Sequence, residues 1–235
     1  MKHIQKFLKN EPKDLKEYRK IKIAKPTYKG YVHGEDKLLK KALAEEQGWI
    51  CAYCNRDIHL ETITVEHYIP QKRHKDSPYP AQKHKDNELN FLNMLATCRD
   101  NVRDCSGLRG NAPLVFMNPS QSDCEKMISY RKKTGGGYEI YATKTQNAAE
   151  IQHELDNILQ LNTDQLCRAR QVVVDRLIDR LRKNKKWNKM EMEQEVKYLQ
   201  SRIVKDANNT KGFSQYCMVA IDYLQQKLSK PYYQQ

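Results

Sequence analysis

The stretch CAYCNRDIHLETITVEHYIPQKR, residues 51–73, contains two chemically distinctive features. It opens with a CxxC pair, Cys51 and Cys54, and this spacing is typical of metal-binding knuckles in reducing compartments. A β-branched run then favours a strand. That run ends at an acid beside a histidine, Glu66 and His67. An acid next to a histidine is typical of catalysis or of a second metal site, so the stretch indicates one small metal-dependent unit.

The cysteine pair needs two further ligands to complete a tetrahedral site. Cys98 and Cys105, in TCRDNVRDCSGLRG, are the natural second pair. Four thiolates suit Zn²⁺ and leave no open coordination position, so such a site is structural. The alternative is that Cys98 and Cys105 are buried thiols and the CxxC pair stands alone. A thiol oxidoreductase is a weaker interpretation, because no βαβ pattern surrounds Cys51.

Composition and charge indicate the class of partner and the cellular compartment of the chain. The 235 residues include 42 Lys and Arg against 29 Asp and Glu, a net charge of +13, which favours polyanionic partners. No apolar run reaches membrane-spanning length, and the start lacks the apolar stretch of a signal peptide. We therefore expect a cytoplasmic protein with no membrane association. In that compartment seven cysteines do not favour a disulfide framework.

Local patterns divide the chain into three parts. Residues 1–48 predict a helical, basic segment broken by KPTYKGYVHG, residues 49–125 a zinc-stapled core, and residues 126–235 a hairpin followed by helices. KMISYRKKTGGGYEIYAT reads as two strands joined by a glycine-rich turn. Asn162 or Thr163 is a plausible helix N-cap. Four apolar stripes at helical spacing follow: Ile151, Leu155, Ile158, Leu159; Leu166, Val173, Leu177, Leu181; Met192, Val196, Leu199, Ile203; and Phe213, Tyr216, Ala220, Leu224, Leu228.

The order of knuckle, strand, Glu-His, loop, Asn and cysteine pair resembles the HNH, or ββα-metal, nuclease finger. The resemblance implies a mainly α protein of the α+β class with a small ββα-metal finger. It implies that Glu66 binds a catalytic Mg²⁺ or Mn²⁺, that His67 is the general base, and that Asn93 on the second strand orients His67. Asn93 lies five residues before Cys98, the spacing typical of this family; the alternative is that Asn93 is a turn residue. This chemistry suits phosphodiester hydrolysis, which needs a base near neutral pH and a cation.

One position departs from that motif. The family usually places a further metal ligand on the helix after the last zinc cysteine, where this chain has Ser106, Gly107 and Leu108. The alternatives nearby are Asp100, Asp104 and Asn111, and the loop histidines His59, His74 and His84. The missing ligand supports a second interpretation, in which the chain is a zinc-stapled nucleic-acid- or protein-binding module with a decayed catalytic metal site.

Over residues 45–115 the chain is similar to a narrower group, the PtuB-type nucleases of Septu antiviral systems and their retron-associated relatives. The residues that carry this similarity are CAYCNRDI, VEHYIPQ and the CSGLRGN segment. The resemblance implies an antiviral effector that degrades DNA or RNA together with a PtuA-type ATPase. In retrons it also implies a reverse transcriptase and its multicopy single-stranded DNA.

Basic residues suggest where nucleic acid would bind. Arg99, Arg103 and Arg109 lie nearest the Glu-His pair and are candidates for holding phosphates. A second cluster surrounds Trp187, whose ring suits stacking on an unpaired base. This cluster contains Arg176, Arg180, Arg182, Lys183, Lys185, Lys186 and Lys189. The alternative for the cluster is a solvated helix end.

Overall fold

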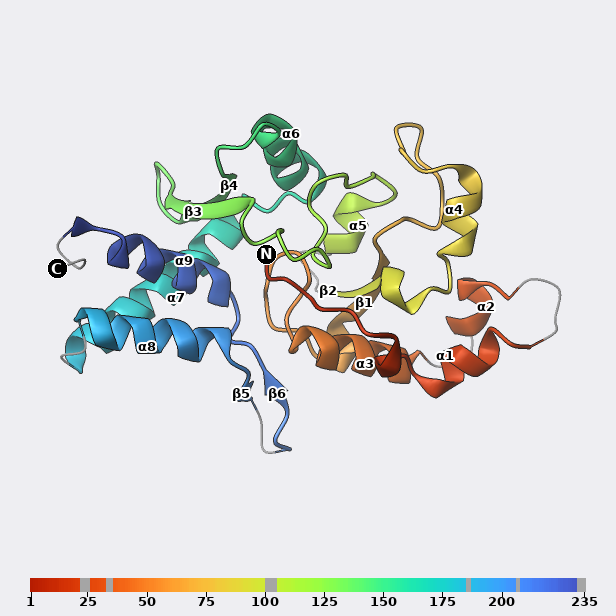
Figure 1. Ribbon diagram of the computed structural model, residues 1–235, viewed down its shortest axis with the longest axis horizontal. Coiled ribbons are helices and arrows are strands. Elements are labelled where there is room, and N and C mark those ends of the chain that lie inside the picture. Colours follow the sequence, from red (N-terminus) through yellow and green to blue (C-terminus); the bar gives the residue numbers. More distant parts are fainter. Residues whose placement is uncertain (22–25, 33–35, 100–104, 185–186, 206–207, 232–235) are drawn as a thin grey trace.

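The computed structural model describes residues 1–21, 26–32, 36–99, 105–184, 187–205 and 208–231. The molecule is elongated, with two groups of elements side by side (Figure 1). One group holds the cysteine-rich region and the N-terminal helices. The other holds the long helices of the second half. The predicted mixed α+β class is confirmed, because the described strands form only two-stranded antiparallel sheets among many helices.

The centre of the first group is a β-hairpin followed by a short helix. Strand β1 (Ile63–His67) pairs antiparallel with β2 (Met94–Cys98), so that Ile63 lies opposite Cys98 and His67 opposite Met94. Helix α5 (Cys105–Arg109) comes next among the described elements and contacts both strands. The β-branched run of the sequence therefore forms the expected strand, and the ββα order of the finger is present.

Helix α3 (Lys37–Gln47) supports this hairpin from outside. The side-chain amide of Gln47 donates to the carbonyl of Ala96 at 2.8 Å and accepts from the N–H of Ala96 at 2.6 Å, which satisfies the outer backbone groups of β2. The helix ends at Gly48, whose φ of 70° is the left-handed conformation that glycine adopts without strain. The turn sends the chain directly into the CxxC knuckle.

The N-terminal part forms short helices, as the sequence predicts. After a short 3₁₀ turn (Leu8–Asn10) come α1 (Lys13–Tyr18) and α2 (Tyr28–Val32). Helix α2 lies inside the KPTYKGYVHG segment, so part of the expected break is itself helical. The Thr27 hydroxyl accepts a hydrogen bond from the N–H of Gly30 at 3.1 Å, so a hydroxyl in the first turn compensates for the glycine.

The second half contains the predicted hairpin, β3 (Ile128–Lys132) with β4 (Tyr138–Ala142). It is followed by α6 (Ala148–His153), which continues as a π-helical turn (Glu154–Ile158), and by α7 (Asp164–Lys183), α8 (Lys189–Gln200) and α9 (Cys217–Leu228). Gly137 is required in the hairpin, because a Cβ there would lie 2.7 Å from backbone and side-chain atoms of Cys167. Asn162 also holds the hairpin, since its side chain exchanges two hydrogen bonds with the backbone of Ile140.

Two of the predicted helical stripes extend too far. Ile203 belongs to a short hairpin, β5 (Ile203–Val204) with β6 (Lys211–Gly212), and Phe213 and Tyr216 precede α9. Arg202, just after the end of α8, donates to the backbone carbonyls of Glu45 and Glu46 at the end of α3. Because this contact attaches the β5–β6 hairpin to α3, helix α8 does not continue into Ile203. This tertiary contact prevails over helical spacing. Thr163 is the N-cap residue of α7, but its side chain makes no capping hydrogen bond.

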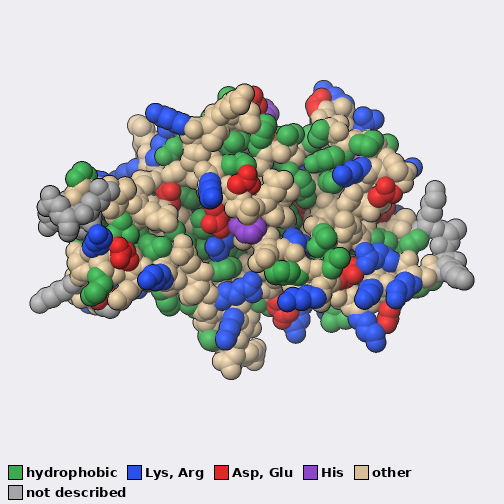
Figure 2. Space-filling model, viewed as in Figure 1, with side chains coloured by type: hydrophobic (Ala, Val, Ile, Leu, Met, Phe, Trp, Pro, Cys, Tyr) green, Lys and Arg blue, Asp and Glu red, His purple; other side chains and the backbone are tan. Residues whose placement is uncertain are grey.

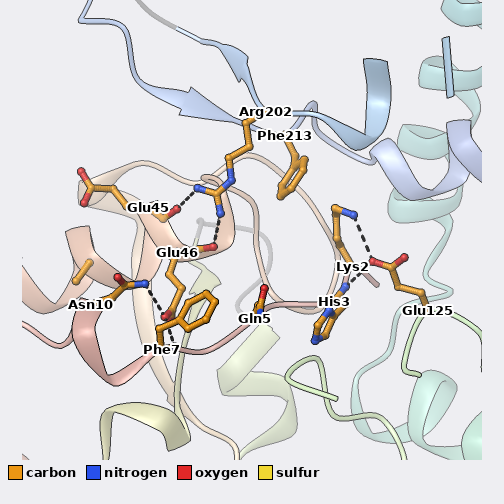
Figure 3. A pocket seen from close by; sticks show the side chains of 11 residues that line it. Lys2, His3, Gln5, Phe7, Asn10, Glu45, Glu46, Glu125, Arg202 and Phe213 are labelled. Carbon is orange, nitrogen blue, oxygen red and sulfur yellow. Dashed lines mark hydrogen bonds and ion pairs between the residues drawn. The ribbon is translucent and has the colours of Figure 1, made fainter. Parts of the chain in front are cut away.

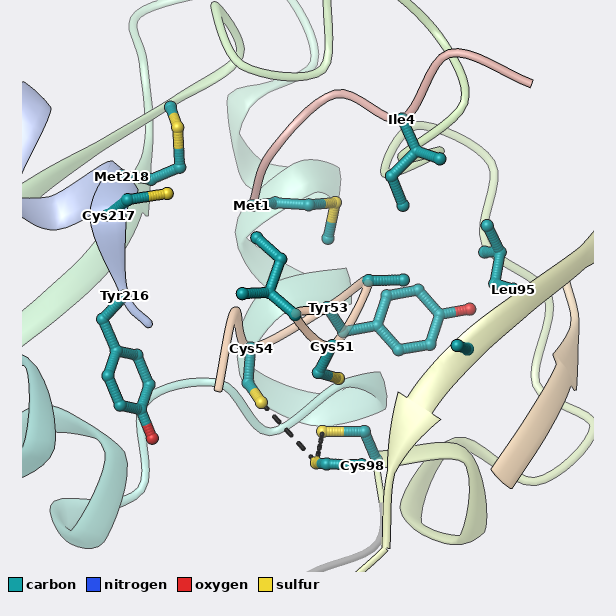
Figure 4. Packing of buried hydrophobic residues seen from close by; sticks show 14 of the residues in the cluster. Met1, Ile4, Cys51, Tyr53, Cys54, Leu95, Cys98, Tyr216, Cys217 and Met218 are labelled. Atoms are coloured by element: carbon teal, nitrogen blue, oxygen red, sulfur yellow. Dashed lines mark hydrogen bonds between the residues drawn. The ribbon is translucent and has the colours of Figure 1, made fainter. Parts of the chain in front are cut away.

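The two groups share one buried core. The first residues run between them, and the amino group of Met1 donates to the hydroxyl of Tyr130 at 2.8 Å. Figure 4 shows Met1 and Ile4 near the ring of Tyr53, beside the knuckle. The three cysteines outside the motif, Cys124, Cys167 and Cys217, are buried. Within the described ranges no helix has the length and apolar character needed to cross a membrane.

Candidate metal centre and histidine site

The four motif cysteines come together in one buried cluster. Their sulfur atoms all lie within 4.8 Å of one another, with 3.6 Å between Cys54 and Cys98 and 3.5 Å between Cys98 and Cys105. Figure 4 shows three of them converging below Tyr53. A tetrahedral zinc with bonds of about 2.3 Å separates its sulfur ligands by about 3.8 Å. The observed spacing therefore fits a structural Zn²⁺ site.

The electrostatics of the cluster also favour a cation. Hydrogen bonds from Cys105, Cys51 and Cys98 hold the pKa of the Cys54 thiol well below its usual range. Burial raises the pKa of Cys51, so its thiol alone does not ionise. Thiolates packed this closely require a compensating positive charge, and four sulfurs are the donor set that zinc prefers. Zinc would then join the knuckle, the end of β2 and the start of α5.

Glu66 lies inside the finger and faces an arginine. Its Oε1 accepts hydrogen bonds from Nη1 of Arg109 at 2.5 Å and from the Tyr53 hydroxyl at 3.2 Å. Arg109 is also buried, and donates further to the carbonyls of His67, at 3.2 Å, and Tyr68, at 2.6 Å. The interpretation of Arg109 as a phosphate contact does not fit this placement, because its guanidinium joins α5 to β1 in the interior.

This arrangement does not fit a catalytic Mg²⁺ or Mn²⁺ at Glu66. The carboxylate is already neutralised by a buried guanidinium, whereas a hard cation needs a carboxylate with free lone pairs. Among the residues that the structure describes, the only group of three or more metal-binding side chains is the four cysteines. Asn111 is exposed, and Asp100 and Asp104 lie outside the described residues.

His67 ends β1 as predicted, but its imidazole is covered. Only 6% of the residue is exposed. Its Nε2 lies 2.9 Å from the carbonyl of Glu88, and the ring packs against Tyr28 with 4.7 Å between centroids and an 82° interplanar angle. Burial lowers the pKa of His67 to about 4; the Glu88 carbonyl opposes this shift and the charge of Arg109 adds to it. The imidazole is therefore neutral at pH 7.

The hydrogen bonds of His67 indicate its tautomer. A carbonyl only accepts, so Nε2 carries the proton that faces Glu88. The other nitrogen, Nδ1, is then unprotonated, and its lone pair faces the side-chain amide nitrogen of Gln71, which donates to it at 3.4 Å. A neutral imidazole with an unprotonated nitrogen can accept a proton from water once water reaches it.

Asn93 supports this site without touching the imidazole. It ends a short 3₁₀ turn (Phe91–Asn93) immediately before β2, and is not on the strand itself. Its side-chain oxygen accepts from the N–H of Ile69 at 2.8 Å, and its amide donates to the carbonyls of Ile69 and Asn87, both at 3.0 Å. Asn93 therefore ties the chain after His67 to the residue before Glu88.

The other predicted site residues lie apart from this group. His84, on α4 (Ala81–Asp86), is buried and contacts the carbonyl of Pro70 at 2.5 Å. His74 lies beside Asp76, and His59 and Arg99 are exposed. Arg182 and Lys183 are exposed at the end of α7, where Arg182 lies over the Trp187 ring at 5.5 Å. Arg103, Lys185 and Lys186 fall outside the described residues.

On the face shown in Figure 2, the basic side chains do not form one uniform patch. In Figure 2, Lys and Arg groups occur over much of the visible face and alternate with Asp and Glu. Arg180 illustrates this mixing, because it makes two hydrogen bonds, of 2.9 and 2.6 Å, with the carboxylate of Glu195. The net charge of the chain therefore does not by itself identify a nucleic-acid surface.

Sequence reasoning missed the residues that enclose His67. Tyr28 comes from the segment taken as a helix break, Gln71 follows the strand, and Glu88 contributes only a backbone carbonyl. A backbone acceptor has no sequence signature. Tyr53 was visible inside the CxxC pair, but nothing local indicated that its hydroxyl would meet Glu66 and Arg109.

A cavity of about 570 Å³ lies between the N-terminal segment and the β5–β6 hairpin. Figure 3 shows the ring of Phe213 between Arg202 and Lys2, whose cationic groups lie 5.4 and 4.7 Å from its centroid. Glu125 bonds to Lys2 at 3.3 Å. The charged groups of this cavity are largely paired within the protein, so it offers no clear ligand chemistry.

Comparison with known proteins adds no family to this description. No protein-family model matches the chain, and a search of curated proteins finds no relative. The features of the chain that bear on its function are therefore its own cysteine cluster and histidine site.

Proposed function

We propose that the chain is an HNH-type endonuclease that hydrolyses phosphodiester bonds in DNA or RNA, with His67 as its general base. The observation that carries the proposal is the placement of a neutral imidazole at the end of the first strand of a cysteine-stapled ββα unit. Burial removes the proton that would block the base, and a backbone carbonyl fixes the tautomer.

The chain's own residues would divide the work as follows. Nδ1 of His67 accepts the proton of the attacking water. Asn93 bonds to the carbonyls of Ile69 and Asn87, and so holds the segment that follows His67 next to the segment that contains Glu88. Cys51, Cys54, Cys98 and Cys105 would hold a zinc ion that joins the hairpin to α5, and four thiolates would leave that ion no open position for the reaction. The resemblance implies a catalytic Mg²⁺ or Mn²⁺, and we assign no residue to it because Glu66 is paired with Arg109.

A cleavage assay tests the proposal. The protein, with its ATPase partner where one copurifies, is incubated with plasmid, single-stranded DNA and total RNA in the presence of Mg²⁺ or Mn²⁺. We expect His67→Ala to reduce cleavage by a factor of ~10² to ~10⁴, the contribution of a positioned base. His153→Ala, at an exposed histidine of α6, is the matched control and should cleave normally. Equal cleavage by both variants would remove His67 from the mechanism.

A second candidate is the zinc-stapled binding module without catalysis. The buried pair of Glu66 and Arg109 favours it, because that pair occupies the carboxylate which a catalytic metal would need. Under this alternative the wild-type protein binds nucleic acid or a protein partner but cleaves no substrate in any complex. Binding without cleavage, unchanged in His67→Ala, would support the module over the nuclease.

We also propose that the chain acts as an antiviral effector with a PtuA-type ATPase, and in a retron setting with a reverse transcriptase and multicopy single-stranded DNA. The support is the resemblance together with apolar side chains exposed on the second half. Val172, Met190 and Tyr198 are 46%, 62% and 48% exposed. Purification from cells that express the whole locus should recover the ATPase, and Met190→Glu with Tyr198→Glu should release it. Repeated recovery of a lone chain contradicts the assembly.

A further inference from the structure

A second, larger cleft lies beside the zinc knuckle. Its volume is about 1120 Å³, and it opens between the end of α3, the segment from Asp57 to Glu61, and the β5–β6 hairpin. None of its lining residues belongs to the cysteine cluster or contacts His67. The segment Asp57–Glu61 leads directly into β1, so the cleft and His67 lie near opposite ends of that strand, about 13 Å apart along it.

The hairpin wall of this cleft is firmly placed. The N–H of Phe213 donates to the carbonyl of Gly48 at 2.8 Å, and Lys205 pairs with Asp57 at 2.5 Å. A Cβ on Gly212 would lie 2.5 Å from the carbonyl oxygen of Gly48. The glycine therefore permits a close approach that a side chain would prevent. The cleft is a built feature of the fold.

The cleft contains an aromatic side chain in a constrained position. Trp49 lines it and is half-buried, with a φ of 59°. The left-handed conformation is uncommon for a bulky residue, and such strain concentrates at ligand sites. The backbone is held there by two hydrogen bonds: the N–H of Trp49 donates to Ala44 at 2.8 Å, and its carbonyl accepts from Ile58 at 3.2 Å.

Cations and amides surround the tryptophan. Four Lys and Arg residues line the cleft: Lys41, Arg202, Lys205 and Lys211. Asp57 pairs with Lys205 and Glu45 with Lys41, so each pair neutralises one lining acid and one lining lysine. Glu61 is the third lining acid, and Lys211 is exposed. Asn208, Asn209 and Gln215 add amide groups that can donate to or accept from base edges. A half-buried aromatic ring among cations and amides is the chemistry that binds unpaired nucleotides.

We propose that this cleft binds a single-stranded nucleic acid, with a base stacked on Trp49 and a phosphate on the exposed Lys211. This deepens the proposed function, on which its link to cleavage rests, by naming the form of the substrate. A base paired within a duplex has both faces covered by its neighbours, so it does not reach a half-buried ring between two walls. An unpaired base does, and its flexible backbone can then follow the cations.

The chain offers a direct optical test of the proposal. It has two tryptophans, Trp49 and Trp187, so Trp187→Phe leaves Trp49 as the sole tryptophan. His67→Ala in the same chain prevents cleavage during the measurement. The probes are oligothymidylate and oligouridylate of about 12 nucleotides, within the usual range of single-strand sites. We expect saturable quenching of Trp49 that weakens with salt, and no comparable quenching by a duplex of equal length.

Affinity measurements on labelled oligonucleotides identify the surface. Trp49→Leu keeps an apolar side chain but removes stacking, and should weaken binding about 5- to 100-fold. Lys211→Gln should weaken it several-fold and reduce its salt dependence. Lys197→Gln, an exposed lysine of α8 outside the cleft, makes the same charge change and should have no effect.

The outcomes separate this proposal from the nuclease itself. Three results would overturn the proposed binding at the cleft. They are the absence of quenching, equal binding of a duplex, and equal affinities of the Lys211→Gln and Lys197→Gln proteins. Loss of affinity in Arg182→Gln with none in Lys211→Gln would place binding on α7 and would also overturn it. Binding at Trp49 without cleavage by the wild-type protein would support the binding site and contradict only the proposed nuclease activity.

Discussion

The guanidinium of Arg109 and the carboxylate of Glu66 form a 2.5 Å ion pair inside the finger, with side chains that are 0% and 9% exposed. The two residues are 43 positions apart in the chain. Their contact joins the last residue of α5 to the penultimate residue of β1. The sequence predicts a metal ligand at Glu66 and a phosphate contact at Arg109, whereas the structure pairs the two side chains in the interior.

Removing one partner of this pair should destabilise the fold. We expect Arg109→Met to lower the free energy of unfolding by about 3–5 kcal/mol, because it leaves the Glu66 carboxylate buried without compensation. Urea denaturation of the zinc-loaded protein measures this. The control is Arg131→Met: its pair with Glu139 has an arginine side chain that is 63% exposed and should cost less than about 1 kcal/mol. Equal effects of the two substitutions would contradict a buried, structural pair.

Elemental analysis of the purified, folded protein should find one zinc per chain. Cys51→Ala removes one of four ligands, so zinc content should fall and the protein should become less stable and less soluble, since structural zinc contributes folding free energy. Cys167→Ala deletes a buried thiol outside the cluster and should retain full zinc. A folded wild-type protein that contains no zinc is incompatible with the site.

The buried histidine predicts a pH dependence of stability. The folded pKa of His67 is about 4, against about 6.5 in an unfolded chain, so between these values the unfolded state binds a proton that the folded state does not. This contribution is fully present above pH ~6.5 and is lost as the pH falls to ~4, by up to about 3 kcal/mol. Because acid also protonates zinc ligands, the measurement is the difference between wild type and His67→Gln. Parallel stability curves would show that His67 is not buried as a neutral base.

The ring of Tyr28 should control the access of water to His67. In Tyr28→Ala the imidazole loses the ring that packs against it, so its pKa should rise from about 4 toward ~6.5 as the charged form becomes solvated. Histidine resonances followed by NMR titration report this shift. Tyr79→Ala, beside His84 at 6.3 Å, makes the same change at another histidine. It should leave the His67 titration unchanged, and a shift in both variants would point to a general loosening of the fold.

The features that the sequence predicted well are those encoded by short spacing. Three features that each span only a few residues form as expected. They are the CxxC pair, the β-branched run before Glu66 and the glycine-rich turn of the β3–β4 hairpin. The role of Arg109 was not predictable in this way. A surface arginine and an arginine in a buried ion pair have the same local sequence, and only the long-range packing of α5 on β1 distinguishes them.

Asn93 shows a second limit. Its spacing to Cys98 correctly indicated a residue near His67, but it contacts backbone groups and not the imidazole. The acceptor that does contact the ring is a carbonyl of Glu88, which any residue could supply. Helical spacing also failed at Ile203, because the contacts of Arg202 with the end of α3 select a hairpin there.

The order of the zinc ligands along the chain has a consequence for how the finger folds. Cys51 and Cys54 precede β1, whereas Cys98 is the last residue of its pairing partner β2 and Cys105 begins α5. Cys54 and Cys98 are 44 positions apart in the chain. In an unfolded chain a metal ion reaches only one pair at a time, and full coordination waits for the loop between the pairs to close. The time course of zinc uptake during refolding therefore records hairpin closure, and a chelator added before that step would trap the chain with β1 and β2 unpaired.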